Sequence, residues 1–443
     1  MPSRSAVSYF GAGPAPLPTP VIESAAQALI NYNDTGLGLS EISHRSPTAN
    51  KILADTKANL ATLLDIPTDD YEILFMQGGG SGEFSAVVYN LVGAWVERRR
   101  RGIVAQSGKA AEEAEVEKEL KRVVEEELRL DYLVTGSWSA KAAQEAKRLI
   151  GDKYVNVALD AREGNGGKFG TIPAEAEWRL TKTKKEGGKG APAFVYYCDN
   201  ETVDGVEMQG FPKALEADGD GGRDAEDERL VVADMSSNFL SRKIDVRKFA
   251  VIFAGAQKNV GVAGITVVII RKSLLPPAIA TPSPSLLRAL GLGSVISPIV
   301  FDYGTIAKNN SLYNTLPIFN LWIAGEVIAS LVATYGSEKV SGQEAVANEK
   351  AALLYLVLDK YPEVYRVVPE KGVRSRMNVC FRVYGGDEGR EKEFLAGGEK
   401  RLLQGLKGHR SVGGIRASNY NAVPVENVRK LVEYLDDYAN GRV

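Results

Sequence analysis

Short apolar runs alternate with segments of helical spacing through about the first 300 residues of this chain. Four runs are nearly all apolar and are bounded by polar or turn-forming residues: 72–76, 194–198, 230–233 and 251–253. Strands of this composition are usually buried on both faces, as they are in parallel sheets. The pattern therefore predicts an α/β domain with a mostly parallel sheet flanked by helices.

The pattern of apolar residues along the chain changes near Pro317. Longer helical patterns follow at 319–335 and 344–361, and they indicate a smaller α+β domain at the C-terminal end. We expect three parts: an N-terminal segment that packs with the small domain (1–16), a large domain (17–316) and the small domain itself (317–443).

Polar stretches interrupt the large domain near 97–129, 182–190 and 216–229, and we expect each of them at the surface. The first has apolar residues at near-helical spacing: Val116, Leu120, Val123 and Leu128. This spacing predicts an amphipathic helix, for which a solvated face is the more common explanation than a partner site. The other two are rich in Lys/Gly and Asp/Gly, which is typical of loops.

Composition narrows the class of protein. Lys plus Arg (54) nearly balance Asp plus Glu (56), so bulk charge predicts neither a nucleic-acid partner nor a membrane surface. No apolar run approaches the roughly 20 residues of a membrane span, and no secretory signal is recognisable. Cys198 and Cys380 lie in apolar runs without metal or disulfide spacing. We therefore expect a cytoplasmic protein of enzyme size without a metal site.

One lysine stands between two apolar runs. Lys258 lies in the small-residue turn 254–261, before the run 265–270, and Asp234 ends an apolar run upstream. Pyridoxal phosphate enzymes use this order of strand, acid, strand and lysine. Their lysine forms a Schiff base with the cofactor, and their aspartate keeps the pyridine nitrogen protonated. By itself, the pattern leaves open the commoner case of a solvated lysine in a surface turn.

A glycine-rich turn offers a place for a phosphate. Residues 78–82 follow the apolar run 72–76 and precede a helical run at 84–92. Glycines at such a turn let backbone N–H groups approach an anion closely. Because Glu83 replaces the last glycine of GxGxxG, and no P-loop spacing is present, a dinucleotide or P-loop site is not indicated. A phosphate cradle and a tight structural turn both remain open.

The only two histidines each precede an arginine, in the pairs His44-Arg45 and His409-Arg410, and Arg416 follows the second pair. Guanidinium groups bind carboxylates and phosphates bidentately, and imidazole adds a donor that titrates near neutrality. Any single pair is more often a surface salt bridge. Together, in loops flanked by Gly or Ser, they indicate a small substrate with two or three anionic groups.

A series of segments resembles the phosphoserine aminotransferases, a family of fold-type I pyridoxal phosphate enzymes. In family order, the matching segments are 10–14 (FGAGP), 41–45 (EISHR), 78–80 (GGG), 136–139 (GSWS), 198–205 (CDNETVDG), 234–237 (DMSS), 254–261 (AGAQKNVG), 313–315 (YNT), 374–378 (RSRMN) and 409–421. The resemblance implies a large cofactor-binding domain on a sheet of the seven-stranded type. It also implies a homodimer with shared active sites.

The resemblance also implies how pyridoxal 5′-phosphate is held. Lys258 would be the Schiff-base lysine, Asp234 would pair with the pyridine nitrogen, and Trp138 would stack on the ring. The implied contacts to the remaining cofactor atoms are Thr202 to the ring hydroxyl, Gly80, Ser81 and Gln257 to the phosphate, and Asn314 and Thr315 to the phosphate from the second subunit.

For the substrates, the resemblance implies that Arg416 binds the α-carboxylate. His44, Arg45, His409 and Arg410 would hold the distal phosphate or carboxylate, some of them donated by the second subunit. The implied reaction is reversible transamination between O-phospho-L-serine with 2-oxoglutarate and 3-phosphonooxypyruvate with L-glutamate, a step of L-serine biosynthesis.

Two positions depart from the family pattern. Ser81 stands where bacterial members often carry arginine, and Glu83 stands where glutamine is common, which is expected to add a negative charge near the cradle. Two other functions were weighed. A desulfurase of the same superfamily needs a mobile cysteine, which neither Cys198 nor Cys380 resembles. A non-catalytic scaffold is disfavoured because Lys258, Asp234 and Trp138 are all present.

Overall fold

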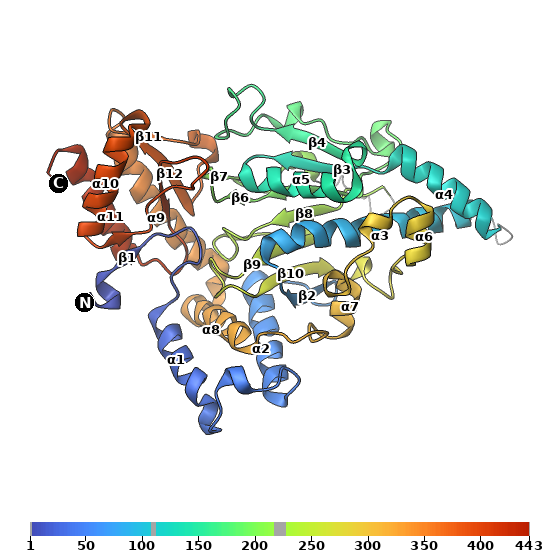
Figure 1. Cartoon of the computed structure of the whole chain (residues 1–443), viewed down its shortest axis with the longest axis horizontal. Helices are drawn as coiled ribbons and strands as arrows, with labels where there is room; N and C mark the ends of the chain where they lie inside the picture. Colours follow the sequence, from blue (N-terminus) through green and yellow to red (C-terminus); the bar gives the residue numbers. More distant parts are fainter. Residues whose placement is uncertain (1, 108–111, 217–226, 443) are drawn as a thin grey trace.

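A central sheet of seven strands organises the molecule, with helices on both of its faces (Figure 1). The structure is a computed structural model that describes residues 2–107, 112–216 and 227–442. Across the sheet the strands are β2 (Tyr71–Met76), β10 (Thr266–Arg271), β9 (Val251–Gly255), β8 (Val231–Asp234), β5 (Phe194–Cys198), β3 (Leu130–Val134) and β4 (Val155–Asp160).

The strands predicted from apolar runs are confirmed, with ends that differ by a residue or two. β9, β8, β5, β3 and β4 run parallel to one another, whereas β10 runs antiparallel to both β9 and β2. The mostly parallel sheet is therefore confirmed, with one reversed strand near its edge. β8, β9 and β10 are buried at every residue, which explains their continuous apolar character.

The two faces of the sheet belong to two different cores. Along β10, Val267 and Ile269 point into one core and Val268 and Ile270 into the other. The α-helices up to residue 335 are α1 (Thr19–Ile30), α2 (Pro47–Leu64), α3 (Gly79–Ser107), α4 (Glu113–Glu127), α5 (Ser137–Ile150), α6 (Pro284–Ala289), α7 (Tyr303–Lys308) and α8 (Ile318–Tyr335). α2 and α8 contribute to the first core, and α3, α4 and α5 contribute to the second.

A second, smaller sheet lies in the C-terminal part. Its order is β11 (Tyr365–Val367), β12 (Asn378–Val383) and β14 (Ile415–Ser418), all antiparallel. It packs with α9 (Val340–Lys360), α10 (Glu388–Lys400) and α11 (Val425–Ala439).

The N-terminal segment joins this smaller part. β1 (Ser8–Tyr9) pairs in parallel with β13 (Leu403–Gln404), and Phe10 is buried in the small core. The boundaries at residues 16 and 316 stay predictions.

α8 corrects one expectation. The stretch Ile318–Glu338 is long and apolar enough, by composition, to cross a membrane, so the expectation that no run approaches that length was wrong. The core helix of a soluble protein passes the same test. Leu321, Ala324 and Ile328 of α8 are fully buried in the core that α8 shares with α2. A third of the apolar stretch is buried, so this packing accounts for part of its apolar composition.

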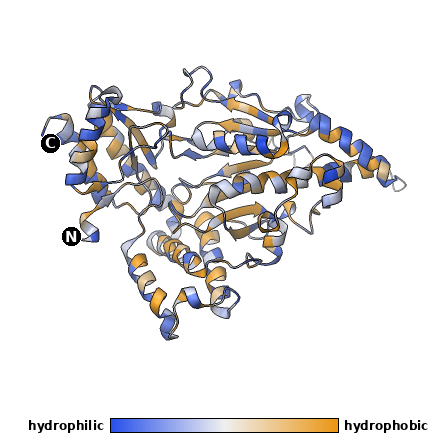
Figure 2. Ribbon diagram, in the orientation of Figure 1, coloured by the Kyte–Doolittle hydropathy of each residue, from blue (hydrophilic) through white to orange (hydrophobic). Residues whose placement is uncertain are grey.

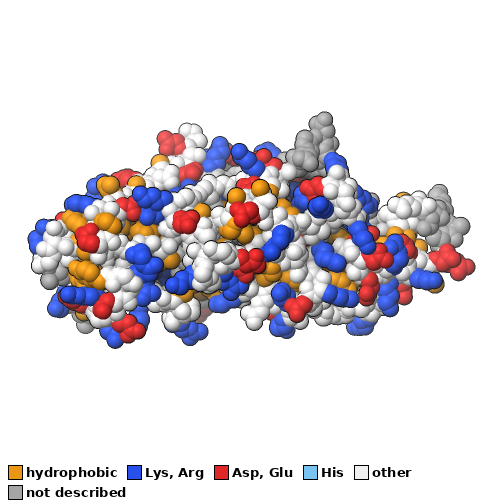
Figure 3. All heavy atoms as spheres, turned by 90° about the horizontal axis from the view of Figure 1, so that it is seen from above, with side chains coloured by type: hydrophobic (Ala, Val, Ile, Leu, Met, Phe, Trp, Pro, Cys, Tyr) orange, Lys and Arg blue, Asp and Glu red, His pale blue; other side chains and the backbone are white. Residues whose placement is uncertain are grey.

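The polar stretch at 97–129 contains the predicted amphipathic helix, α4. Its first residues instead extend α3, which runs well beyond the predicted 84–92. The buried face of α4 includes Leu120 and Val123, while hydrophilic residues cover its outer side (Figure 2). Figure 3 shows Lys/Arg and Asp/Glu side chains intermixed on the face seen from above. The described residues of the stretch 97–129 therefore belong mainly to the end of α3 and to α4, and both helices contribute to the second core of the sheet.

The structure describes the second polar stretch throughout and the third only in part. Residues 182–190 form a loop with a short turn, Lys184–Glu186, in which Glu186 accepts from Arg229. In the third stretch, residues 217–226 lie outside the described residues.

We predict that Leu120→Ala lowers the free energy of unfolding by about 2–5 kcal/mol, because the leucine is fully buried and its loss leaves a cavity. Lys121→Ala, one position further along α4 and exposed, should change it by less than about 0.5 kcal/mol. Urea unfolding of both variants checks this. Equal effects would contradict the anchored packing of α4.

Candidate active site

A cavity of about 630 Å³ opens at the carboxyl ends of β5, β8 and β9, where α/β sheets usually bind ligands. Its walls come from the central sheet, from residues 12–14 of the N-terminal segment, and from the C-terminal part. The predicted site residues that line it are Gly80, Ser81, Trp138, Thr202, Asp234, Gln257, Lys258, His409 and Arg416. Residues far apart in sequence therefore converge on one space.

Lys258 lies in this cavity, in the turn that follows β9. Its Nζ donates a 2.6 Å hydrogen bond to Thr202 Oγ1. Burial lowers the pKa of the Lys258 amine, and the positive charge of Arg416 lowers it further, whereas Asp234 acts in the opposite direction. A buried amine with a lowered pKa is more readily uncharged, which is the form that acts as a nucleophile or accepts a proton.

Asp234 ends β8 deep in the same cavity. Its Oδ1 accepts a 2.8 Å bond from the backbone N–H of Ser236, and burial raises the pKa of its carboxyl. Gly80 faces this carboxylate: a Cβ on Gly80 would lie 3.5 Å from Asp234 Oδ2. The preceding residues Gly78 and Gly79 have φ of +113° and +63°, which L side chains rarely adopt. The glycine turn thus brings the N-terminus of α3 to the cavity.

The N-terminus of α5 carries Trp138 to the cavity, and it is held by a carboxylate that the sequence analysis did not single out. Glu201 accepts from the backbone N–H groups of Trp138 (2.8 Å) and Ser139 (2.9 Å). Burial raises the pKa of Glu201 to about 7. A Cβ on Gly136 would lie 2.3 Å from Glu201 Cγ, so only glycine fits there. Trp138 is thereby fixed by its backbone.

Positive groups form the far wall of the cavity. Arg416, on β14, donates from Nη1 to the backbone oxygen of Thr202 at 3.2 Å, while its buried Nε has no hydrogen-bond partner. Partial burial lowers the pKa of His409, and nearby Arg416, Lys141 and Arg410 lower it further. Lys141 Nζ lies 4.2 Å from the Trp138 ring centroid. Arg416 on this wall, with the charges of Lys141 and Arg410 nearby, favours an anionic ligand.

Five predicted residues do not line the cavity of one chain. They are His44, Arg45, Asn314, Thr315 and Arg410. Arg45, Thr315 and Arg410 are exposed. His44 has a buried Nε2 without a hydrogen-bond partner, and Asn314 donates to Gln77 Oε1.

The comparisons with known proteins agree with this geometry. The family model Aminotransferase class-V matches residues 7–173 and 152–431. Phosphoserine aminotransferase of Saccharomyces cerevisiae is 44% identical over 437 residues, 98% of each chain. The chain belongs to the phosphoserine aminotransferase family.

Solved structures of this family have the same fold. Phosphoserine aminotransferase from Bacillus circulans subsp. alkalophilus is 32% identical, with a TM-score of 0.76 and 98% coverage of both chains. A PLP-bound phosphoserine aminotransferase from Trichomonas vaginalis is also 32% identical, with a TM-score of 0.75, and the alignment covers 97% of this chain and 99% of that one.

Glu83, the position that departs from the family pattern, is fully buried on α3. Tyr303 donates to its Oε2 at 2.7 Å, and its Oε1 has no hydrogen-bond partner. Burial raises the pKa of Glu83 to about 8, and the nearby charge of Asp234 acts in the same direction. The carboxyl is therefore largely uncharged near neutral pH, which corrects the expectation of an added negative charge.

We predict that Glu83→Gln stabilises the protein more at high pH than at low pH. The folded wild type keeps the Glu83 proton up to about pH 8, whereas the unfolded chain loses it near about pH 4.3. Between these values the folded state binds more protons, so wild-type stability falls as pH rises through this window. The glutamine side chain does not titrate, so the variant lacks this pH-dependent loss of stability.

Thermal unfolding from about pH 5 to about pH 9 should show the Tm of the variant rising relative to wild type. Exposed Glu117→Gln is the control and should show no such trend. A Tm difference independent of pH would contradict the raised pKa.

Proposed function

We propose that this chain catalyses reversible transamination between O-phospho-L-serine with 2-oxoglutarate and 3-phosphonooxypyruvate with L-glutamate, using pyridoxal 5′-phosphate. The observation that carries the proposal is a half-buried lysine of lowered pKa, Lys258, in a cavity that also holds Asp234 and Arg416. Family membership supports the same reaction, which belongs to L-serine biosynthesis.

The residues of the cavity fit the cofactor. Gly80, Ser81 and Gln257 would hold its phosphate at the start of α3, where backbone N–H groups and the helix dipole favour an anion. Trp138 would cover the ring face, and Thr202 would reach the ring hydroxyl. When bound, the cofactor supplies a ring that accepts the electron pair released at the substrate α-carbon.

The protein supplies proton transfer and charge. Lys258 Nζ, whose pKa is lowered by burial, would accept the proton from the substrate α-carbon and return it during the second half of the reaction. Asp234 would keep a proton on the pyridine nitrogen, since its buried carboxylate is best stabilised by a cation. The Thr202 hydroxyl, 2.6 Å from Nζ, orients the amine.

Arg416 would bind the α-carboxylate of either amino acid. Its Nη1 is already fixed on Thr202 O, and its unpaired Nε leaves a donor for a carboxylate oxygen. His409 would help to hold the distal anion, which is a phosphate in one substrate pair and a carboxylate in the other. A cluster of cationic donors accepts both shapes more readily than one bidentate pair does.

A homodimer would complete the site. His44, Arg45, Asn314, Thr315 and Arg410 lie outside the cavity of one chain. We propose that a second copy brings at least the first four of them to it. We also propose a cytoplasmic location, which fits the free, unpaired state of both cysteines.

A desulfurase is the less favoured activity. Cys198 and Cys380 are both buried, and burial raises the pKa of each thiol, that of Cys380 to about 12. A reactive cysteine needs an accessible thiolate.

The absorption spectrum of the cofactor-loaded protein tests the reaction. Addition of O-phospho-L-serine should remove the long-wavelength absorption band of the cofactor, and L-alanine should leave it unchanged.

Lys258→Ala should lower turnover by at least about 10³-fold, because the proton carrier is lost, without unfolding the protein. Exposed Lys308→Ala is the control. If the absorption band does not change when phosphoserine is added, the proposed substrate is wrong. Normal turnover by Lys258→Ala would refute the proposed role of the lysine.

Subunit mixing tests the shared site. Arg45→Ala should lower kcat/KM for O-phospho-L-serine by the equivalent of about 2–5 kcal/mol, with unchanged cofactor affinity. If Arg45 acts across the dimer, refolding Arg45→Ala together with Lys258→Ala creates hybrids with one complete site, restoring about a quarter of wild-type activity. No recovery in confirmed hybrid dimers would show that Arg45 serves its own chain.

A further inference from the structure

The hairpin that carries Thr202 sets the spacing between two groups of the site. It consists of β6 (Asn200–Glu201), a turn, and β7 (Val206–Glu207). Thr202, in the turn, accepts from Lys258 through Oγ1 at 2.6 Å and from Arg416 through its backbone oxygen at 3.2 Å. A shift of the hairpin would therefore move Lys258 and Arg416 relative to each other.

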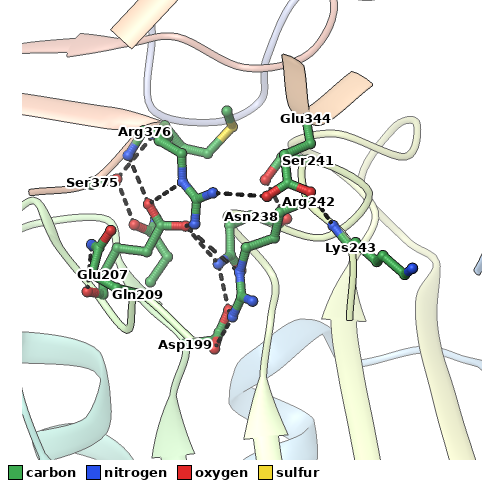
Figure 4. Close-up of polar contacts among 12 residues, drawn as sticks. Asp199, Glu207, Gln209, Asn238, Ser241, Arg242, Lys243, Glu344, Ser375 and Arg376 are labelled. Carbon is green, nitrogen blue, oxygen red and sulfur yellow. Dashed lines mark hydrogen bonds and ion pairs between the residues drawn. The ribbon is translucent and has the colours of Figure 1, made fainter. Parts of the chain in front are cut away.

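A buried ionic network lies at the base of this hairpin (Figure 4). Glu207, with no exposed surface, accepts three bonds from Arg376: from backbone N at 2.7 Å, Nη2 at 2.7 Å and Nε at 3.2 Å. Beside it, Asp199 accepts two bonds from Arg242 Nη2, at 2.7 and 2.6 Å. Two buried carboxylates thus face two arginines, and Arg376 Nη1 also lies 3.4 Å from the carboxylate of Glu344.

Arg376 reaches the hairpin from the C-terminal part of the chain. It precedes β12, and its neighbour Ser375 donates from backbone N to Gly205 O at 2.9 Å. A Cβ on Gly205 would lie 2.8 Å from Asn378 O, so the turn of the hairpin packs directly on β12. The segment around Arg376 therefore holds the hairpin in place from the side of the small sheet.

We propose that Arg376 is a positioning residue: by holding Glu207 it fixes the hairpin, and through Thr202 it sets the placement of Lys258 and Arg416. Without the guanidinium, Glu207 would keep the backbone N–H of residue 376 at 2.7 Å, Asn238 Nδ2 at 3.3 Å and Arg242 Nε at 3.9 Å. A buried carboxylate that loses its bidentate partner is strongly destabilised, and the hairpin can relieve this by opening toward water.

The two cysteines of the chain are natural reporters of such opening. Cys198 Sγ contacts Asn200 O at 3.3 Å, and Cys380 Sγ contacts Val203 O at 3.5 Å. Both thiols are buried against the hairpin. The reaction of Cys380 with a disulfide reagent such as DTNB therefore measures how often the hairpin opens, whereas Cys198 also borders the cavity and its reaction depends on whether the cavity is filled.

The same segment offers a matched control. Arg374 bridges to Val206 of β7 through its backbone, but its guanidinium makes a bidentate pair at 2.8 Å with Asp359, which is 36% exposed. Arg374→Gln removes a guanidinium two positions away from Arg376 and leaves Glu207 paired. Arg376→Gln removes the guanidinium that we propose holds Glu207.

We expect Arg376→Gln to speed thiol modification by roughly 10- to 100-fold, and Arg374→Gln by less than about twofold. Arg376→Gln should also raise KM for O-phospho-L-serine, through Arg416, and lower kcat, through Lys258. Arg376→Lys keeps the charge without the planar fork, so it should fall between wild type and Arg376→Gln in both measurements.

Equal thiol rates in Arg376→Gln and Arg374→Gln would overturn the hold of Arg376 on the hairpin, and faster thiols with unchanged KM and kcat would overturn positioning. If Arg376→Gln does not fold, Arg376→Lys and Glu207→Gln carry the same comparison. The kinetic readout rests on the proposed function, whereas the thiol readout does not. If the wild-type protein does not act on phosphoserine, the proposed function is refuted. The thiol rates alone would then test whether Arg376 holds the hairpin.

Discussion

The structure depends on keeping one amine, that of Lys258, out of bulk water. Burial favours its uncharged form, and the surrounding chain must supply polar contacts without supplying a direct ion pair. Thr202 gives a hydrogen bond, and Asp234 gives a more distant opposite charge. The central sheet provides the rigidity, because Asp234 and Lys258 follow adjacent, fully buried parallel strands.

Around this amine, buried carboxylates hold backbone and side chains in position. Glu201 binds the N-terminus of α5, and Glu207 binds Arg376 from the C-terminal part. Both belong to the hairpin that carries Thr202, so one short element connects the helix behind Trp138 with the smaller sheet. The polar groups form a layer between the apolar cores, where each buried charge needs a defined partner.

The local pattern of apolar and small residues was sufficient to predict much of the fold around the site. The apolar runs predicted the strands around Asp234 and Lys258, and small residues marked the turns at Gly80 and Lys258. β3 was not predicted because Asp131 interrupts its apolar run. Its carboxylate is buried and bonded to Thr181, a partner 50 residues away. Arg376 and Glu207, 169 residues apart, likewise become partners only through the fold. Where Arg45 acts depends on assembly, which the pattern of one chain does not encode.

The walls of the cavity come from both ends of the sequence. Residues 12–14 lie beside Lys258, and Tyr420 donates to Ala12 O at 2.8 Å, while β1 pairs with β13. During synthesis the first of these segments leaves the ribosome some 400 residues before its partners, and N-terminal regions emerge long before C-terminal ones. The large sheet can fold earlier, but the pocket closes only after translation has passed Arg416. The complete set of cavity walls therefore exists only once nearly the whole chain has been made.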